Sequence, residues 1–330
     1  MRLLVANRGE IAVRILRAAA EMDIPTVAVY SEDDAQALHV RRAGESHRLN
    51  GTGAPAYLDM DQIVAAAGEH GCDAVHPGYG FLSEQAEFAR RCEAAGVAYV
   101  GPRPETLDAF GQKTHARDLA QHCGVPVLRG INDSVSLGQA RDFLASLGPG
   151  ATMVIKAVAG GGGRGMRVVA DASEVESLYA RCESEAKAAF GDGRLYVEEY
   201  MHSARHVEVQ IAGDGSGAVT HLWERECSIQ RRHQKMVEIA PCPALDPSLR
   251  RRILDDAVRM AREASYRNLG TFEFLVEAAA GPNSRYAFIE ANARLQVEHT
   301  VTEEVLDMDL VKLQLRLAAG ETLASLGLAQ

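Results

Sequence analysis

Short apolar runs alternate with longer segments of helical periodicity over the first hundred residues. Strands are predicted at 3–6, 26–30, 74–76 and 98–100, and helical spacing of apolar residues lies between them, as around 85–95. Strands that alternate with helices in this way predict a parallel sheet covered by helices on both faces. The N-terminal part is therefore expected to be a doubly wound α/β domain.

The pattern changes after Gly101-Pro102-Arg103-Pro104, which we interpret as a domain boundary because prolines interrupt both helices and central strands. A helix is expected at 112–122. The strands expected beyond it lie at 125–127, 153–157, 195–197, 207–211, 219–223, 271–277 and 285–290, and further helices at 249–263 and 310–319. The fold class predicted for the whole chain is α/β followed by α+β.

Composition and charge exclude several classes of protein. The chain has 47% hydrophobic and 24% charged residues, as globular proteins do, and its net charge of −10 argues against a nucleic-acid partner. No apolar run approaches the ~20 residues of a membrane span, and the N-terminus lacks a secretory pattern. The six cysteines form no CxxC pair, so we expect reduced thiols in a cytoplasmic protein.

A run of four glycines, 160–163, follows the predicted strand 153–157 and precedes Arg164. Such a backbone can turn its N–H groups toward an anion. The run lacks the Lys-Ser/Thr ending of a P-loop, and a flexible hairpin tip is the alternative. Lys156 favours the anion site, because a lysine in an otherwise apolar strand is costly unless it meets an anion. A lysine that snorkels at a sheet edge is the alternative there.

Two carboxylates are predicted to face each other in a hairpin. Glu273 alternates with apolar residues, and a turn near Gly281-Pro282 would place it opposite Glu290. Asn292 and Arg294 follow at two-residue spacing and would project to the same side. Carboxylate and amide oxygens suit Mg²⁺ or Mn²⁺, which can bridge to ATP phosphates. A solvated polar face of the hairpin is the alternative.

Three other segments are weaker signals. The cationic stretch 226–235 could bind a polyanion, although such a run is usually a solvated loop. The segment 76–80, His-Pro-Gly-Tyr-Gly, follows a strand, where ligands gather in open sheets, but it is also typical of a tight turn. The segment 7–10 has one glycine and fails the dinucleotide fingerprint, which disfavours a dehydrogenase.

Taken together, these segments resemble biotin carboxylase, a member of the ATP-grasp superfamily, over nearly the whole chain. The matching motifs are 5–12, 76–84, 160–166, 230–235 and 288–299. The resemblance implies a pre-ATP-grasp domain at 1–110 and an ATP-grasp domain at 111–330, with a mobile glycine-rich lid at about 130–203.

The resemblance also implies roles for individual residues. The ATP phosphates would be held by Lys113, Lys156, Gly162 and Gly163, adenine by Glu198, Glu199, Tyr200 and Met201, and the rest of the nucleotide by His206, Gln230 and His233. Metal ions would be held by Glu273, Glu290 and Asn292, bicarbonate by Lys235, Arg294, Gln296 and the backbone of Val297, and biotin would lie near Tyr79 and Gly80. Glu298 would be the general base, and Arg294 would stabilise the biotin enolate.

The activity so implied is ATP-dependent carboxylation of biotin by bicarbonate, through carboxyphosphate, in an acyl-CoA type carboxylase. The expected partners are a biotin carboxyl carrier domain and a carboxyltransferase, and a homodimer stays open. Biotin carboxylases continue for roughly another domain beyond this length, so we expect the chain to be a fragment. Two rivals are a ligase like carbamoyl-phosphate synthetase and an ATP-binding regulatory domain without turnover.

Overall fold

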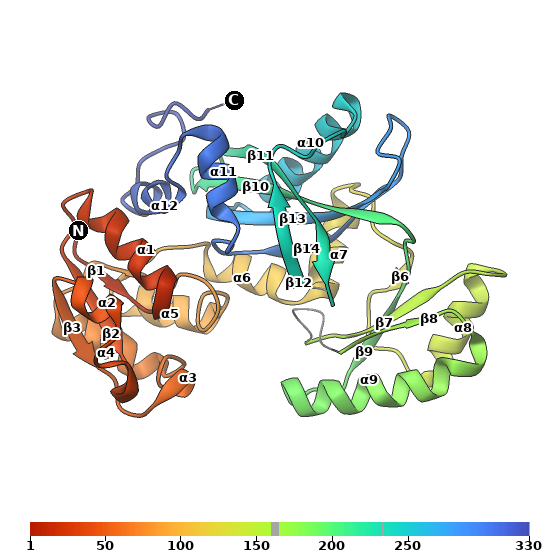
Figure 1. Cartoon of the computed structure of the whole chain (residues 1–330), viewed down its shortest axis with the longest axis horizontal. Coiled ribbons are helices and arrows are strands. Elements are labelled where there is room, and N and C mark those ends of the chain that lie inside the picture. Colours follow the sequence, from red (N-terminus) through yellow and green to blue (C-terminus); the bar gives the residue numbers. More distant parts are fainter. Residues whose placement is uncertain (160–164, 233, 330) are drawn as a thin grey trace.

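The computed structural model describes residues 1–159, 165–232 and 234–329. Within these residues the strands form three sheets, which follow one another along the chain in the order A, C and B (Figure 1). None of the described helices combines the length and the apolar character that a bilayer crossing requires. All six cysteines are unpaired thiols, as expected.

Sheet A is parallel throughout, which confirms the predicted N-terminal architecture. Its strands have the order β3-β2-β1-β4-β5. They are β1 (Leu3–Val5), β2 (Thr26–Tyr30), β3 (Glu45–Arg48), β4 (Ala74–His76) and β5 (Ala98–Tyr99). The strand order reverses between β1 and β4, and such a switch point opens a crevice at the carboxyl ends of the two strands.

Helices cover both faces of sheet A because its apolar side chains alternate. Leu3 and Val5 pack against α1 and α12, whereas Leu4 and Val27 pack on the face covered by α4 and α5. The helices of this part are α1 (Gly9–Ala20), α2 (Leu38–Arg42), α3 (Gly53–Ala56), α4 (Met60–Glu69) and α5 (Ala86–Ala94), with a 3-10 turn at Glu32–Asp34. Helix α12 (Leu310–Ala318) comes from the other end of the chain.

Sheet C is antiparallel and has the order β6-β9-β7-β8. Its strands are β6 (Gly130–Ile131), β7 (Met153–Ala157), β8 (Met166–Val169) and β9 (Leu195–Glu199), and its helices are α8 (Leu137–Leu147) and α9 (Val175–Phe190), with a 3-10 turn at Ala172–Glu174. Met153 and Ile155 of β7 pack with the two helices. Lys156 therefore points to the opposite face of the sheet.

Sheet B is antiparallel and has the order β12-β11-β10-β13-β14. Its strands are β10 (Ala204–Asp214), β11 (Val219–Arg231), β12 (Gln234–Ile239), β13 (Arg267–Glu277) and β14 (Tyr286–Asn292). The neighbouring helices are α6 (Pro104–Gly111), α7 (Lys113–His122), α10 (Pro247–Glu263) and α11 (His299–Leu306).

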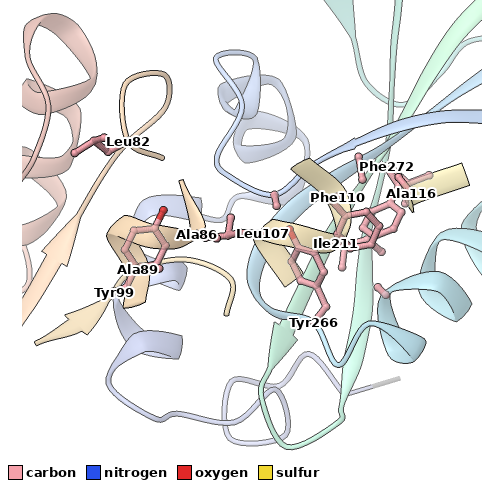
Figure 2. Packing of buried hydrophobic residues seen from close by; sticks show 14 of the residues in the cluster. Leu82, Ala86, Ala89, Tyr99, Leu107, Phe110, Ala116, Ile211, Tyr266 and Phe272 are labelled. Carbon is pink, nitrogen blue, oxygen red and sulfur yellow. The ribbon is translucent and has the colours of Figure 1, made fainter. Parts of the chain in front are cut away.

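An aromatic core fastens α6 to sheet B (Figure 2). The ring of Phe110 meets that of Phe272 edge to face, with centroids 5.1 Å apart, and Tyr266 packs beside both rings. Leu107 of the same helix belongs to the cluster that extends to Tyr99 of sheet A. Helix α6 thus joins the two sheets through one continuous core.

The strand predicted at 125–127 is wrong. The structure has only an isolated bridge there, between Val127 and Phe288. Pro126 accepts a hydrogen bond from the Phe288 N–H at 2.8 Å but has no N–H of its own to donate, so a regular ladder cannot form.

Candidate active site

A cavity of 450 Å³ lies between sheets C and B and gathers most of the residues predicted for the nucleotide. It is lined by side chains from the helix α7, from both sheets and from the hairpin β13–β14. The predicted residues among them are Lys113, Lys156, Glu199, Tyr200, Met201, His206, Gln230 and Glu290. Gly162, Gly163 and His233 lie outside the described residues.

Two lysines bring positive charge to this cavity. Lys113 Nζ lies 2.7 Å from Glu290 Oε2, and Lys156 pairs with Glu198. Burial alone would lower the pKa of Lys113, but the carboxylates of Glu290, Glu198 and Glu273 together outweigh burial and raise that pKa above its ordinary value. Lys113 is therefore charged at neutral pH and suited to phosphate oxygens.

Glu198 is placed differently from the other residues expected at adenine. Its side chain is 1% exposed and pairs with both Arg117 and Lys156. Burial raises the pKa of this carboxyl, but Lys156 and Arg117 together hold it below its usual range. Glu199 and its two successors line the cavity, whereas the Glu198 carboxylate faces the helix α7.

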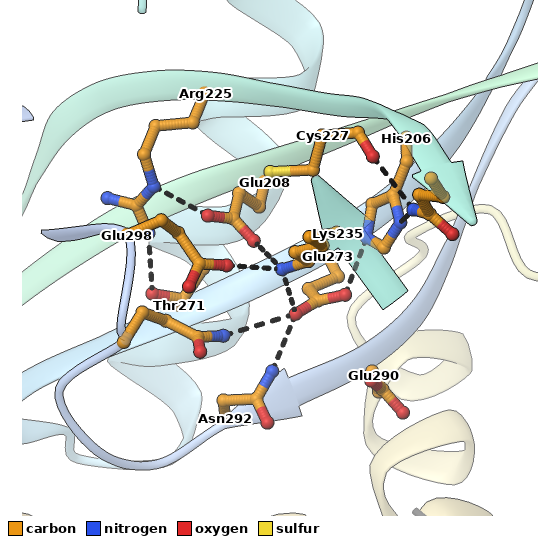
Figure 3. A network of polar contacts seen from close by, with 12 residues as sticks. His206, Glu208, Arg225, Cys227, Lys235, Thr271, Glu273, Glu290, Asn292 and Glu298 are labelled. Atoms are coloured by element: carbon orange, nitrogen blue, oxygen red, sulfur yellow. Dashed lines mark hydrogen bonds and ion pairs between the residues drawn. The ribbon is translucent and has the colours of Figure 1, made fainter. Parts of the chain in front are cut away.

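The acidic hairpin has the predicted register, with Glu273 paired to Glu290 across β13 and β14. Each carboxylate has its own basic partner, because Glu290 pairs with Lys113 while Glu273 Oε2 lies 2.5 Å from His206 Nε2. Asn292 Nδ2 donates to Glu273 Oε1 at 2.6 Å. Figure 3 accordingly draws Glu290 apart from the network around Glu273.

Lys235 lies at the centre of that network (Figure 3). Its Nζ is 2.5 Å from Glu208 Oε2, 2.6 Å from Glu298 Oε1 and 3.2 Å from Glu273 Oε1. Burial opposes the charge, but the three carboxylates outweigh it and raise the pKa of Lys235. The side chain is about one fifth exposed, so Lys235 is partly accessible to solvent.

Glu208 and Arg225 complete the network, and sequence reasoning missed both. Arg225 is fully buried, and its Nε donates to Glu208 Oε1 at 2.5 Å. Its Nη1 donates to Gln210 and Thr302, and its Nη2 donates to Thr271. The signal was present, because Glu208 alternates with valines in the strand predicted at 207–211, as Glu273 does in its own strand.

Arg294 connects the hairpin with the N-terminal part of the chain. Its guanidinium donates to Gln296 Oε1 at 2.7 Å, to Asn292 Oδ1 at 3.0 Å and to Glu84 Oε2 at 3.0 Å. Gln296 in turn donates to Glu273 Oε1 at 3.2 Å. Of the side chains predicted for bicarbonate, Lys235 and Gln296 contact the Glu273 carboxylate directly, and Arg294 is linked to it through Gln296. The side chain of Val297 is 59% exposed.

Tyr79 and Gly80 lie in the turn that follows β4, at the switch point of sheet A. The turn leads to Glu84 and so to Arg294. His76 starts it and is fully buried, with Nδ1 accepting from the Gly78 N–H at 3.0 Å. Burial lowers the pKa of His76 to about 3, so the imidazole is neutral in the folded state.

This buried histidine gives a testable pH dependence. Below about pH 6.5, His76 binds a proton in the unfolded state but stays neutral in the folded state. The free energy of unfolding therefore falls as pH falls. Between pH 7.5 and 5 wild type should lose about 2 kcal/mol more than His76→Gln, in which the other histidines are unchanged. Urea unfolding at the two pH values measures this, and parallel losses in both proteins would contradict it.

Comparison with known proteins covers the whole chain. The family described as "Biotin carboxylase, N-terminal domain" matches residues 1–107, and the one described as "Carbamoyl-phosphate synthase L chain, ATP binding domain" matches 112–326. Mitochondrial pyruvate carboxylase from Rattus norvegicus is 51% identical over 100% of this chain, and pyruvate carboxylase from Aspergillus niger is 49% identical. The chain spans 28% of the length of these relatives.

Solved structures agree in fold. Biotin carboxylase from Campylobacter jejuni has a TM-score of 0.94 at 41% identity and is matched over 73% of its chain and 100% of this one. The biotin carboxylase domain dimer of 2-oxoglutarate carboxylase from Hydrogenobacter thermophilus has a TM-score of 0.92 at 41% identity, over 70% of its chain and 97% of this one. The chain therefore belongs to the biotin carboxylase family of ATP-grasp ligases.

Proposed function

We propose that this chain carries out the ATP-dependent carboxylation of biotin by bicarbonate, as the biotin carboxylase part of a biotin-dependent carboxylase. One observation supports this most strongly: a cavity with two lysines adjoins a cluster in which Lys235 is surrounded by three carboxylates. His206 joins the two, since it lines the cavity and contacts Glu273. A charged cluster beside a nucleotide-sized cavity suits phosphoryl transfer to a small oxyanion.

We assign the nucleotide to the cavity. Lys113 and Lys156, which now pair with Glu290 and Glu198, would hold its phosphates. Adenine would lie against Glu199, Tyr200 and Met201, with the remaining contacts made by His206, Gln230, His233, Gly162 and Gly163. The carboxylate of Glu198, predicted to lie at adenine, is instead buried against Lys156 and does not line the cavity. The C. jejuni and H. thermophilus structures, which are described with a β,γ-ATP ligand and with ADP, support this assignment.

The donor set of the hairpin fits a magnesium or manganese ion. Glu273, Glu290 and Asn292 supply carboxylate and amide oxygens, which are the ligands that these ions prefer. The ion, when bound, would offset the charge of the phosphates. Lys113, which now neutralises Glu290, would then be released to the nucleotide.

The metal assignment predicts a change in magnesium requirement. Glu290→Gln should raise the Mg²⁺ concentration for half-maximal ATP cleavage about tenfold or more, because an amide oxygen is a weaker ligand than a carboxylate. A Mg²⁺ titration of steady-state ATP cleavage measures this. Glu277→Gln, on the same strand as Glu273 but at its far end, is the control and should leave the requirement as in wild type. Equal requirements in all three proteins would reject the assignment.

We place bicarbonate between Lys235, Arg294, Gln296 and the Val297 backbone, with Glu298 as the general base. Glu298 would take the bicarbonate proton while a bicarbonate oxygen attacks the γ-phosphorus and ADP leaves, which gives carboxyphosphate. Carboxyphosphate would break down to CO₂ and phosphate, and phosphate would take the ureido proton of biotin. The resulting enolate, stabilised by Arg294, would attack CO₂, with biotin held near Tyr79 and Gly80.

The acceptor that finally receives the carboxyl group is not set by this site. The sequence suggested an acyl-CoA, but the curated relatives named here are pyruvate carboxylases, and the acyl-CoA type lacks support from them. A single-chain long-chain acyl-CoA carboxylase has the same fold at 40% identity. We therefore propose a biotin carrier and a carboxyltransferase as partners, without a preferred acyl group.

We also propose domain boundaries, an oligomeric state and a location for the protein. Boundaries at 1–110 and 111–330, with a lid at 130–203, are supported by the separation of the three sheets along the chain. A homodimer is supported by the dimeric H. thermophilus domain. The expected cytoplasmic location remains a prediction, because the rat relative is mitochondrial by name.

Phosphate release tests the proposed function. With Mg²⁺ and ATP, release should require bicarbonate and rise further when free biotin is added. A carbamoyl-phosphate synthetase-like ligase would ignore biotin, and a regulatory ATP-binding domain would release no phosphate. Either result would reject the proposal.

A further inference from the structure

The turn between β4 and Glu84 contains a residue whose backbone angles are unfavourable without support from other parts of the chain. Gly78, Gly80 and Phe81 have φ angles of +65°, +67° and +45°. Glycine adopts such angles freely, but at Phe81 this conformation costs free energy, so contacts from elsewhere must hold the turn. The shape of this segment matters because the proposed function places biotin at Tyr79 and Gly80.

Asn7 supplies those contacts. Its Nδ2 donates to Pro77 O at 2.6 Å and to Tyr79 O at 2.9 Å, while its Oδ1 accepts from the Arg8 N–H at 2.8 Å. The two carbonyl oxygens can only accept and the Arg8 N–H can only donate, so the orientation of the amide is unambiguous. The side chain is 2% exposed, which keeps water from replacing these bonds.

The topology of sheet A places Asn7 there. β1 and β4 are parallel neighbours, and the Ala6 N–H donates to His76 O at 2.9 Å, which extends their ladder by one residue beyond the end of β1. Asn7, which follows Ala6, therefore faces the residues that come directly after β4. The approach is close, since a Cβ on Gly78 would come 3.0 Å from Asn7 Nδ2.

The C-terminal end of this turn contacts Arg294 through Glu84. Tyr99 Oη donates to Ser83 O at 2.6 Å, and Glu84 Oε2 accepts from Arg294 Nε at 3.0 Å. Arg294 is the side chain to which we assign the biotin enolate. A displaced turn would therefore alter both the surface that meets biotin and a carboxylate that orients Arg294.

We propose that Asn7 is a positioning residue for biotin, because its amide fixes the turn that carries Tyr79 and Gly80. This inference rests on the proposed function. Asn7 is not among the described residues that line the nucleotide cavity, so its loss should act on biotin rather than on ATP. A purely structural asparagine would change stability and leave the KM for biotin unaltered.

The test replaces the amide by a group of the same shape. Asn7→Asp puts carboxylate oxygen against two carbonyl oxygens and removes both donated bonds. Asn268→Asp is the matched control, since Asn268 is 1% exposed and its Nδ2 donates to the backbone oxygen of Gln314, in α12, at 3.0 Å and to no residue of the turn. Two measurements are made on each protein: the KM values for free biotin and MgATP in bicarbonate-dependent ATP cleavage, and hydrogen exchange of peptides that cover 77–84.

Asn7→Asp should raise the KM for biotin about tenfold or more, as expected for two lost buried bonds, with a change of less than about twofold for MgATP. Exchange over 77–84 should accelerate in this variant and not in Asn268→Asp. An unchanged biotin KM in folded Asn7→Asp, unaltered exchange, or equal effects in the control would each overturn the inference. If wild type itself shows no bicarbonate-dependent cleavage, the proposed function fails, and exchange still decides whether Asn7 holds the turn.

Discussion

Replacement of Glu298 by glutamine should lower bicarbonate-dependent ATP cleavage about 100-fold or more, with little change in the KM for ATP. Glutamine keeps the shape of the side chain and can still accept a hydrogen bond from Lys235, but it cannot take a proton. General-base contributions of this size are typical when the base is well placed. Steady-state phosphate release over a range of bicarbonate concentrations measures the effect.

The structure gives Glu298 the features of a base. Its Oε1 is held by Lys235 at 2.6 Å, whereas its Oε2 has no hydrogen bond among the described residues. The residue is 8% exposed, so few waters compete for the proton. Glu304→Gln, on the exposed side of α11, is the matched control and should behave as wild type. A rate in Glu298→Gln close to that of the control would show that another group takes the proton.

Replacement of Arg225 by methionine should destabilise the fold by about 3–5 kcal/mol, because it leaves the buried Glu208 with Lys235 as its remaining cation. Methionine fills much of the space of the arginine but provides none of its five donors. Urea unfolding measures the loss. The exposed pair of Arg141 and Glu176 provides the control, and Arg141→Met should cost less than about 1 kcal/mol.

A double variant separates stability from function. Arg225→Met together with Glu208→Met removes both buried charges, and such replacements often recover stability. Activity should stay low, because Lys235 then loses the carboxylate 2.5 Å from its Nζ.

A loss of unfolding free energy below about 1 kcal/mol for Arg225→Met alone would contradict the stabilising role given to the buried pair of Arg225 and Glu208.

The parts of the fold that were predictable are those specified locally. Alternation of apolar and polar residues in 271–277, together with the Gly-Pro turn, was enough to place Glu273 opposite Glu290. The same reasoning predicted the parallel sheet from its strand–helix alternation. The strand prediction at 125–127 was wrong because it relied on apolar character and gave no weight to Pro126, which lacks the N–H that a ladder needs.

The site was less predictable, because its contacts join segments that are distant in sequence. Arg225 meets Thr302 across 77 positions, and Asn7 meets the Tyr79 carbonyl across 72. No periodicity encodes such pairs. Lys156 illustrates this. The sequence predicted that it meets an anion, but its partner Glu198 lies on another strand and is brought to it by the pairing of β7 with β9.

Transfer of labelled carbon from bicarbonate to biotin tests the central claim most directly. We expect label in biotin when ATP, Mg²⁺ and bicarbonate are all present, none when ATP is omitted, and about 100-fold slower labelling when Glu298 is replaced by glutamine. Phosphate release with no label in biotin, in a folded protein supplied with all substrates, would contradict the account.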